Sequence, residues 1–598
     1  MTGWEISAAA TVALVAVVTF YLGRRSATLH NAAQDFDMAR RTVRSRRNAA
    51  AVSGEYLCAA SFLGIAGAIL TDGADALWYP IGFTAGYLVL MLFVAAPLRR
   101  SGAYTLPDFV EARLDSRGIR WFASLITVLI ALLYMVPQLQ GAQLAVTTLF
   151  PVPDWAGPVA VIGVVLVTVL GGGMRATTLA QAFHYWLKLF AIAVPTLVLC
   201  VVFIGSGGKG AAAGLADAAP PTLPQDTTVT VDTPVKLQVS TPTTLYADGV
   251  VDGAPAKGEV LWSAEVRHDV AAGTTLRFDA GTPTPVVVGA PADNADWLAP
   301  GGGDTWDLLG TYSLLTALML GTMGLPHILA RFYTNPDGRA ARRTTLHVVL
   351  LIGLFYLFPV LLGALSRLYV PRLLVTGEKD AAVLLLPTSV LPGIGGQILA
   401  AVIVAGVFSA FLAATSGLVY SVAGVISADL MPERVRDFRS AAVLLALSAL
   451  GIALVPRQPD IAHGIAIAFA LAASTFCPVL VLGIWWRGLT AKGAAAGMFV
   501  GGVAVLTALG LDIASDYTGG WAPVLLERPA LLSVPAAFIT AALVSLASRN
   551  TGSATVNNFM LRMHAPDRLG FVTDAAIPRY GRAEERIRLG HGQGRHRR

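Results

Sequence analysis

Two glycine-rich clusters lie inside otherwise apolar segments of the chain. Residues 53–67 contain three glycines and two serines, and residues 320–331 contain Gly321, Gly324 and Pro326. Proline removes a backbone hydrogen bond and clashes with the preceding turn, so the second cluster predicts a broken helix. At a break, free amides favour an anion and free carbonyls favour a cation. These clusters are therefore candidate binding sites, although close helix packing explains any single glycine more simply.

The composition predicts that these clusters lie in a membrane. Of the 598 residues, 55% are apolar and only 13% are charged, and the mean hydropathy is +0.64. These values exclude a soluble multi-domain enzyme and the disordered and fibrous classes. The three cysteines, Cys58, Cys200 and Cys477, lie in apolar runs. They indicate neither a disulfide framework nor a metal cluster.

Hydropathy predicts an all-α polytopic membrane protein with about 13 transmembrane helices. A bilayer core about 30 Å thick needs about 20 apolar residues per helix. The predicted spans are 4–22, 49–70, 77–97, 120–147, 157–171, 179–205, 308–330, 345–366, 393–427, 440–456, 463–486, 493–511 and 529–548.

The basic residues predict the orientation of these spans. Of 43 Lys and Arg residues, 32 fall in one set of loops and in the C-terminal tail, 10 fall on the opposite side, and Lys188 lies within a span. Positive residues favour the cytoplasmic side, so the N-terminus is expected outside and the C-terminus inside. An odd number of spans agrees with this orientation.

The two glycine clusters divide the chain into repeats. Each opens a block of five spans, and an odd block length gives the two blocks opposite orientations, as in the inverted repeats of transporters.

The external loop 206–305 shows period-two alternation at 233–239 and 274–278, which predicts a small β-rich insertion or, equally, a partly ordered linker. The expected segments are an extra helix with a basic cytoplasmic loop (1–48), a first repeat (49–205), the insertion (206–305), a second repeat (306–486), two C-terminal helices (487–548) and a mobile basic tail drawn to anionic lipid (549–598).

Seven ordered motifs resemble the sodium/solute symporter family, in its cation/acetate (monocarboxylate) branch. They cover roughly residues 35–550 apart from the insertion. The motifs are Gly54–Gly67, Asp75–Phe83, Leu98–Phe109, Tyr134 with Pro137–Gly141, Gly172–Thr178, Gly324–Tyr333, and Ser416–Leu418 with Ser427–Leu430. This resemblance implies a LeuT-like fold with a five-plus-five inverted repeat, and sodium-driven uptake by alternating access.

The resemblance also implies an ion site. Its ligands would be the backbone carbonyls of Gly54 and Leu57 and the hydroxyls of Thr415 and Ser416. Oxygen ligands suit a hard cation such as sodium. However, the hydroxyl pair lies one residue nearer to Asp429 than in the proline and sugar branches. One residue turns a helix by about 100°, so without a local bulge the hydroxyls would miss the ion. Coupling to protons therefore stays open.

The substrate is expected between the two broken helices. The sugar branch of the resembled family would need long polar side chains near Ala60 and Ser61. Alanine and serine offer only a small hydroxyl there, which suits a small solute better than a sugar. His327 is a proton or carboxylate partner or, equally, makes a conformational hydrogen bond. The candidate substrate-binding residues are Ser61, Gly64, Tyr134, Gln138, Gly321, Gly324, Pro326 and His327.

Two further basic residues, His184 and Lys188, lie one turn apart on one face of their span. For Lys188 the favoured interpretation is a side chain that extends to the cytoplasmic interface. The alternative is an exit path for an anion. Asp72 and Asp75, at the outer end of the second span, are expected to be solvated loop carboxylates rather than groups that attract cations.

The sequence thus predicts a plasma-membrane, multi-pass symporter that carries a short-chain monocarboxylate (acetate, propionate or pyruvate) with sodium. A proton-coupled or different small-solute symporter is the alternative. A membrane sensor is disfavoured because the 50-residue tail is too short for an output domain, and no catalytic motif indicates an enzyme. The expected partners are the monocarboxylate, sodium and the lipid bilayer, with no other cofactor, no nucleic acid and no obligate protein partner.

Overall fold

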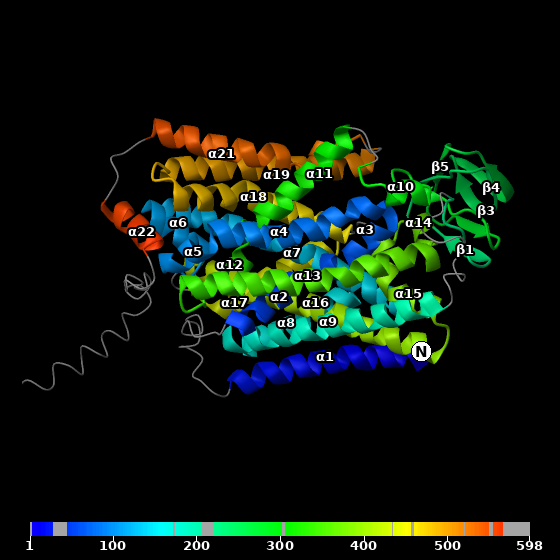
Figure 1. Cartoon of the computed structure of the whole chain (residues 1–598), viewed down its shortest axis with the longest axis horizontal. Helices are drawn as coiled ribbons and strands as arrows, with labels where there is room; N and C mark the ends of the chain where they lie inside the picture. Colours follow the sequence, from blue (N-terminus) through cyan, green and yellow to red (C-terminus); the bar gives the residue numbers. More distant parts are fainter. Residues whose placement is uncertain are drawn as a thin grey trace, which may run out of the picture.

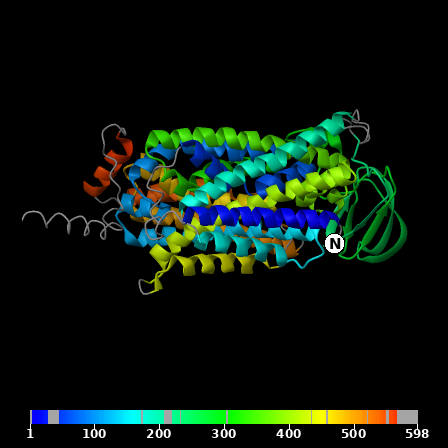
Figure 2. The ribbon, with the colours of Figure 1, turned by 90° about the horizontal axis from the view of Figure 1, so that it is seen from below.

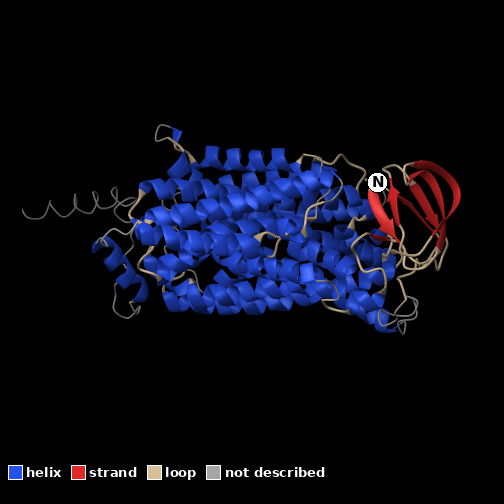
Figure 3. Cartoon of the chain, turned by 90° about the horizontal axis from the view of Figure 1, so that it is seen from above, coloured by secondary structure: helices blue, strands red, loops and turns tan. Residues whose placement is uncertain are grey.

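The computed structural model is a bundle of helices with a β-sheet at one end (Figure 1). It describes residues 3–27, 45–171, 174–205, 219–231, 233–301, 305–432, 435–455, 460–518, 521–548 and 554–565. Views from below and from above, each turned by 90° from the view of Figure 1, show the long helices running along the same axis (Figures 2 and 3). The sheet and the N-terminal end of α1 lie at one end of the bundle, and α22 lies at the other (Figure 1).

The long helices coincide with the apolar runs of the sequence. Among the described residues, eight helices are long and apolar enough to cross a membrane, or nine if one bent pair is counted as a span. The main bundle helices are α1 (Gly3–Ala27), α4 (Trp78–Phe93), α7 (Arg117–Leu149), α8 (Ala156–Gly171), α9 (Met174–Gly205), α13 (Gly338–Tyr369), α16 (Ile394–Val425), α17 (Phe438–Ala453), α18 (Ile461–Trp485), α19 (Ala491–Thr518) and α21 (Ala530–Ala547). The helical membrane fold is thereby confirmed, while the count of 13 spans stays a prediction.

The first glycine cluster forms a broken helix. Helix α2 (Ser45–Tyr56) ends at Tyr56, Leu57 and Cys58 lie outside any helix, and the chain resumes as a π-helical turn, η2 (Ala60–Gly64), followed by α3 (Ile65–Asp72). The α2 carbonyls nearest this interruption lose their intrahelical partners and need other donors.

The second cluster also breaks its helix. Helix α11 (Thr305–Gly321) passes through a 3₁₀ turn, η4 (Thr322–Gly324), and bends by 48° into α12 (Pro326–Phe332). Pro326 occupies the first turn of α12, where its missing N–H costs nothing. A Cβ on Gly321 or on Gly324 would lie 2.4 Å from a backbone carbonyl oxygen of α18. Glycine at these positions therefore permits close packing of the bent pair on α18.

Shorter helices complete the bundle ends. They are α5 (Ala95–Ser101), α6 (Leu106–Leu114), α10 (Asn294–Leu298), α14 (Leu373–Thr376), α15 (Ala382–Val390), α20 (Val524–Glu527) and α22 (Ala554–His564), with 3₁₀ turns η3 (Gly73–Leu77) and η5 (Lys379–Ala381) and a π-turn η6 (Ile426–Leu430).

The expectation of a mobile tail is wrong for residues 554–564. These residues form α22, whose Phe559 ring lies 5.9 Å from the ring of Phe109. The tail beyond residue 565, and the basic loop 28–44 of the first predicted segment, lie outside the described residues.

The insertion between α9 and α11 folds into one antiparallel sheet. Its strand order is β1-β6-β3-β5-β2-β7, with β4 paired to β3. The strands are β1 (Thr227–Thr230), β2 (Val235–Gln238), β3 (Thr243–Val251), β4 (Ala254–Trp262), β5 (Arg267–Val270), β6 (Thr275–Phe278) and β7 (Val286–Val287). Strands β2 and β6 lie where the sequence alternates with period two. Val375 of α14 packs into the core of this sheet, so the insertion is attached to the helical bundle.

Candidate functional site

The carbonyls at the end of α2 surround a buried ammonium group. Lys188 Nζ of α9 donates hydrogen bonds of 2.5 Å to the carbonyl oxygens of Gly54 and Leu57. The Lys188 side chain is fully buried. The expectation that Lys188 extends to the cytoplasmic interface is therefore wrong. A cation at the C-terminal end of a helix is favourable because the free carbonyls concentrate partial negative charge there.

His184, one turn before Lys188, is also fixed inside the protein. Its Nδ1 lies 2.7 Å from Ser409 Oγ of α16, and its Nε2 lies 3.2 Å from Thr19 Oγ1 of α1. These contacts join α9 to α16 and to α1 one turn before Lys188.

The hydroxyls of the predicted ion site form different contacts. Ser416 Oγ donates to the Ala413 carbonyl at 3.2 Å. Thr415 Oγ1 is buried and has no hydrogen-bond partner among the described residues. Helix α16 continues without interruption through both residues, and the π-turn η6 lies farther along the chain. The local bulge that would correct the one-residue offset is thus not at the hydroxyl pair.

A set of aromatic rings lies beside the break in α2. Tyr356 of α13 stacks on Phe83 with ring centroids 6.0 Å apart, and its hydroxyl lies 2.9 Å from Ser61 Oγ. Tyr134 and Phe83 both lie near Phe469, at centroid distances of 6.1 and 5.2 Å. The region between the two broken helices is therefore lined by packed aromatic rings, with hydroxyls among them.

Two predicted substrate residues hold the backbone of the break. Gln138 Oε1 accepts a hydrogen bond from the Ala59 amide at 2.8 Å, and the Tyr134 hydroxyl donates to the Tyr56 carbonyl at 3.4 Å. Gly64 packs on α18, because a Cβ there would lie 3.1 Å from the Ala462 nitrogen. The structure thus brings Ser61, Tyr134 and Gln138 together at the break, and it gives Gly64, like Gly321 and Gly324, a packing role.

His327 is one of the buried polar side chains that the fold leaves without a hydrogen-bond partner among the described residues. It is 1% exposed, and neither ring nitrogen has a hydrogen-bond partner among the described residues. Its ring contacts Tyr134 edge to face, with centroids 4.9 Å apart. Buried polar atoms without partners are rare in folded proteins, so the His327 nitrogens are candidates for contact with a bound solute or water.

Sequence reasoning missed Tyr356 and the contact that Lys188 makes. Tyr356 lies in an apolar helix, and no pattern in the sequence distinguishes it from other buried aromatics. Lys188 had a signal, since it is the basic residue that falls inside a predicted span, and charges in a membrane are costly unless they have a function or a partner. Among the described residues, no group of three or more His, Cys, Asp or Glu is arranged to hold a metal ion.

Comparison with known proteins agrees with this architecture. The model of the sodium:solute symporter family matches residues 36–255 and 284–501. The chain belongs to this family. It is 31% identical over 521 residues to a monocarboxylic acid transporter of Corynebacterium glutamicum, covering 82% of each chain. It is 29% identical to an uncharacterised symporter, YwcA, of Bacillus subtilis, covering 89% of this chain and 92% of the relative.

Solved structures show the same fold at low sequence identity. The symporter aligns with a Na⁺-coupled sialic acid symporter at a TM-score of 0.61 and 14% identity, covering 92% of this chain and 99% of the other. It aligns with a nucleobase-cation-symport-1 family transporter at a TM-score of 0.50 and 11% identity, covering 88% and 98%. The described bundle therefore has the fold of membrane transporters.

A buried ion pair joins the two broken helices of the symporter on one side of the site. Arg331 Nε of α12 lies 2.9 Å from Glu55 Oε2 of α2. The Arg331 guanidinium also donates to Thr178 Oγ1 at 2.8 Å and to Gln181 Oε1, both on α9. The structure thus closes this side of the site through a single guanidinium shared by three helices.

A second buried carboxyl group joins elements on the opposite side. Asp380 of η5 accepts a hydrogen bond from the Ile461 amide at the start of α18, at 3.1 Å. Its neighbour Lys379 lies 2.9 Å from Asp460. Burial, assisted by the Asp460 charge, raises the pKa of Asp380 from 3.8 to about 7. Lys379 lowers the pKa of Asp460.

This raised pKa predicts a pH-dependent stability. Because the pKa of Asp380 is higher in the folded than in the unfolded chain, its contribution is full below the unfolded value and is lost as the pH rises through about 7. Asp380→Asn keeps an oxygen acceptor for Ile461 and removes the ionisation. We expect thermal stability to fall less in this variant than in the wild type between about pH 5 and 8. Equal pH profiles in thermal melts would contradict the assignment.

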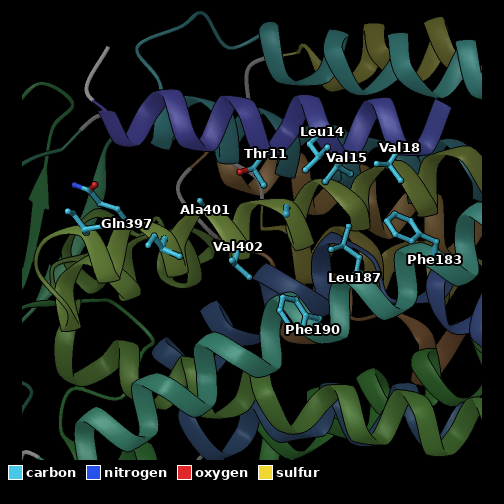
Figure 4. Close-up of a pocket in the computed structure, with 13 residues that line it drawn as sticks. Thr11, Leu14, Val15, Val18, Phe183, Leu187, Phe190, Gln397, Ala401 and Val402 are labelled. Atoms are coloured by element: carbon cyan, nitrogen blue, oxygen red, sulfur yellow. The ribbon is translucent and has the colours of Figure 1, made fainter. Parts of the chain in front are cut away.

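Cavities in the described part of the chain also lie outside the site. One of about 560 Å³ lies between α1, α9 and α16 and is lined mainly by apolar side chains such as Leu14, Leu187 and Val402 (Figure 4). Another of about 690 Å³ lies where the sheet meets the bundle and includes Asp72, Asp75 and Arg528. Asp75 Oδ1 accepts a hydrogen bond from the Gly301 amide, so this carboxylate fixes a loop.

Proposed function

We propose that this chain is a secondary active symporter that takes up a short-chain monocarboxylate, such as acetate, propionate or pyruvate, across the plasma membrane by alternating access. Family membership supports symport, and the relative named as a monocarboxylic acid transporter supports the substrate class. The aromatic rings packed beside Ser61 and Tyr356 favour a small solute over a sugar.

The observation that carries the substrate class is the charge of the site. The groups at the contacts of α2, α9 and α12 include two cations, Lys188 and Arg331, and one carboxylate, Glu55. Buried charges need a partner of opposite sign, so this cluster favours one bound anion. His327, with both nitrogens unpartnered, is the proposed second contact for a carboxylate group.

We also propose the inverted-repeat organisation. In this proposal residues 49–205 and 306–486 form two five-helix repeats, each opened by a broken helix (α2–η2–α3 and α11–η4–α12). The substrate lies between the breaks, near the bilayer midplane. Residues 1–48, 206–305, 487–548 and 549–598 are additions to this core.

The coupling ion has two candidates. Sodium is supported by the family and by the Na⁺-coupled sialic acid symporter of similar fold. Protons are the second candidate, and the position of Lys188 favours them, because its ammonium group lies at the carbonyls expected to bind sodium.

Uptake into proteoliposomes tests the function. We expect labelled acetate to accumulate above its equilibrium level when an inward gradient of sodium or of protons is imposed, because symport couples solute to ion flow. Accumulation should disappear when the matching ionophore collapses the gradient, and unlabelled propionate or pyruvate should compete. Absence of accumulation of all three acids under both gradients would contradict the proposal.

A further inference from the structure

We propose that Lys188 is a built-in cation of the broken helix α2 and occupies the position in which a sodium ion would bind between the Gly54 and Leu57 carbonyls. This inference rests on the proposed function and deepens it. It assigns the group that supplies the positive charge at the first helix break during transport. It implies that sodium does not bind at this break, whatever ion drives uptake.

The carbonyl oxygens at the break are already used. An ammonium group has three donor positions. Lys188 directs two of them to Gly54 and Leu57, each at 2.5 Å. A sodium ion needs the same two oxygens and would have to lie beside a fixed positive charge. Both the space and the charge at this position therefore exclude a second cation while Lys188 is in place.

With Lys188 in place, the two hydroxyls of the expected ligand set do not complete a sodium site. Ser416 Oγ donates to the Ala413 carbonyl within its own helix. Thr415 Oγ1 is buried without a hydrogen-bond partner among the described residues. While Lys188 is in place, the residues present thus do not fit the ion that the family implies, because two of the four expected ligands face an ammonium group and a third is used within α16.

The surroundings of Lys188 hold its ammonium group in position. A Cβ on Gly54 would lie 2.1 Å from the Gln181 carbonyl oxygen, so α2 and α9 are in direct backbone contact. His184 is held by Ser409 and Thr19, as described above. The charged neighbour on α2 is Glu55, which is itself paired with Arg331. The backbone that carries Lys188 is therefore held against α2, α16 and α1, and its ammonium group is held by the Gly54 and Leu57 carbonyls.

A tethered cation has a different consequence from a free one. A sodium ion that binds at a helix break dissociates in each transport cycle, and its binding therefore couples transport to the sodium gradient. Lys188 cannot leave, so it stabilises the break in every cycle without external sodium. Closure of the broken helix, and binding of the carboxylate beside it, are then expected without sodium.

Two matched substitutions test this inference on the purified full-length chain. Lys188→Ala removes the ammonium group and opens space at the two carbonyls, whereas Lys188→Met removes the donors but keeps most of the volume. We expect sodium chloride, compared with choline chloride at equal ionic strength, to raise the melting midpoint of Lys188→Ala by several degrees. The same exchange should leave wild type and Lys188→Met unchanged. Binding of radiolabelled sodium should follow the same order.

If Lys188→Ala does not fold, sodium binding measured on the wild type still tests the inference. Saturable sodium binding by wild type that is lost in Thr415→Ala/Ser416→Ala would overturn the inference, as would equal sodium effects in Lys188→Ala and Lys188→Met. These readouts need no substrate. Absence of uptake of all three acids under both gradients would therefore count against the proposed function alone, and saturable sodium binding at the break in the wild type would count against this inference alone.

Discussion

Arg331→Met is expected to destabilise the symporter strongly. The substitution leaves Glu55 as a fully buried carboxylate without its cation and removes the donors to Thr178 and Gln181. Breaking a buried ion pair from one side costs about 3–5 kcal/mol. We therefore expect a large loss of monodisperse protein after detergent extraction and a strongly lowered melting midpoint.

The double variant Glu55→Gln/Arg331→Met distinguishes the effect of an isolated buried charge on stability from the effect of altered packing. It removes both charges together, and such replacements are often nearly neutral because no isolated charge stays buried. We expect it to recover much of the stability that Arg331→Met loses. Arg342→Met, at an exposed position of the same residue type, should change the midpoint little. If Arg331→Met is as stable as Arg342→Met, the ion pair does not hold the broken helices together.

Gly54→Ala is expected to have the second large effect. The added Cβ would lie 2.1 Å from the Gln181 carbonyl oxygen and 3.0 Å from the same carbonyl carbon. These are backbone atoms inside α9 and cannot move aside as a flexible side chain would. Helices α2 and α9 must separate, which breaks the contact between Lys188 and the Gly54 carbonyl. We expect a loss of at least about 3 kcal/mol, at the upper end for overpacked cores.

A matched glycine provides the control for this prediction. Gly163 of α8 faces away from the bundle, and a Cβ there has nothing within 4 Å. Alanine has a higher helix propensity than glycine, so Gly163→Ala should be neutral or slightly stabilising. Thermal melts and acetate uptake of the two variants, measured in parallel, check the prediction. Similar behaviour of both would show that the α2–α9 contact tolerates a methyl group.

Much of the fold could be predicted from local sequence patterns. Hydropathy indicated the long helices, Pro326 and its glycines indicated a bent helix, and period-two alternation indicated strands at β2 and β6. The motifs indicated the family, which the family model confirms. These features are readable because bilayer thickness, proline geometry and strand pleating constrain residues that are close together in the sequence.

The site itself depended on contacts that no local pattern contains. Lys188 lies 134 residues from Gly54 in the sequence, and Tyr356 lies 295 residues from Ser61. Helical periodicity gave no reason to place either pair together. The same glycines that suggested ligand binding, Gly321 and Gly324, contact α18 instead, because close backbone packing and ligand approach both require a missing side chain.

The sequence by itself therefore determined that the chain lies in a membrane, where its long helices are, and at which positions two of them break. Only the tertiary structure decided what lies at the first break, because a buried charge takes whichever partner the packing of distant helices brings within reach. In this protein that packing places the ammonium group of Lys188 on the carbonyls of Gly54 and Leu57.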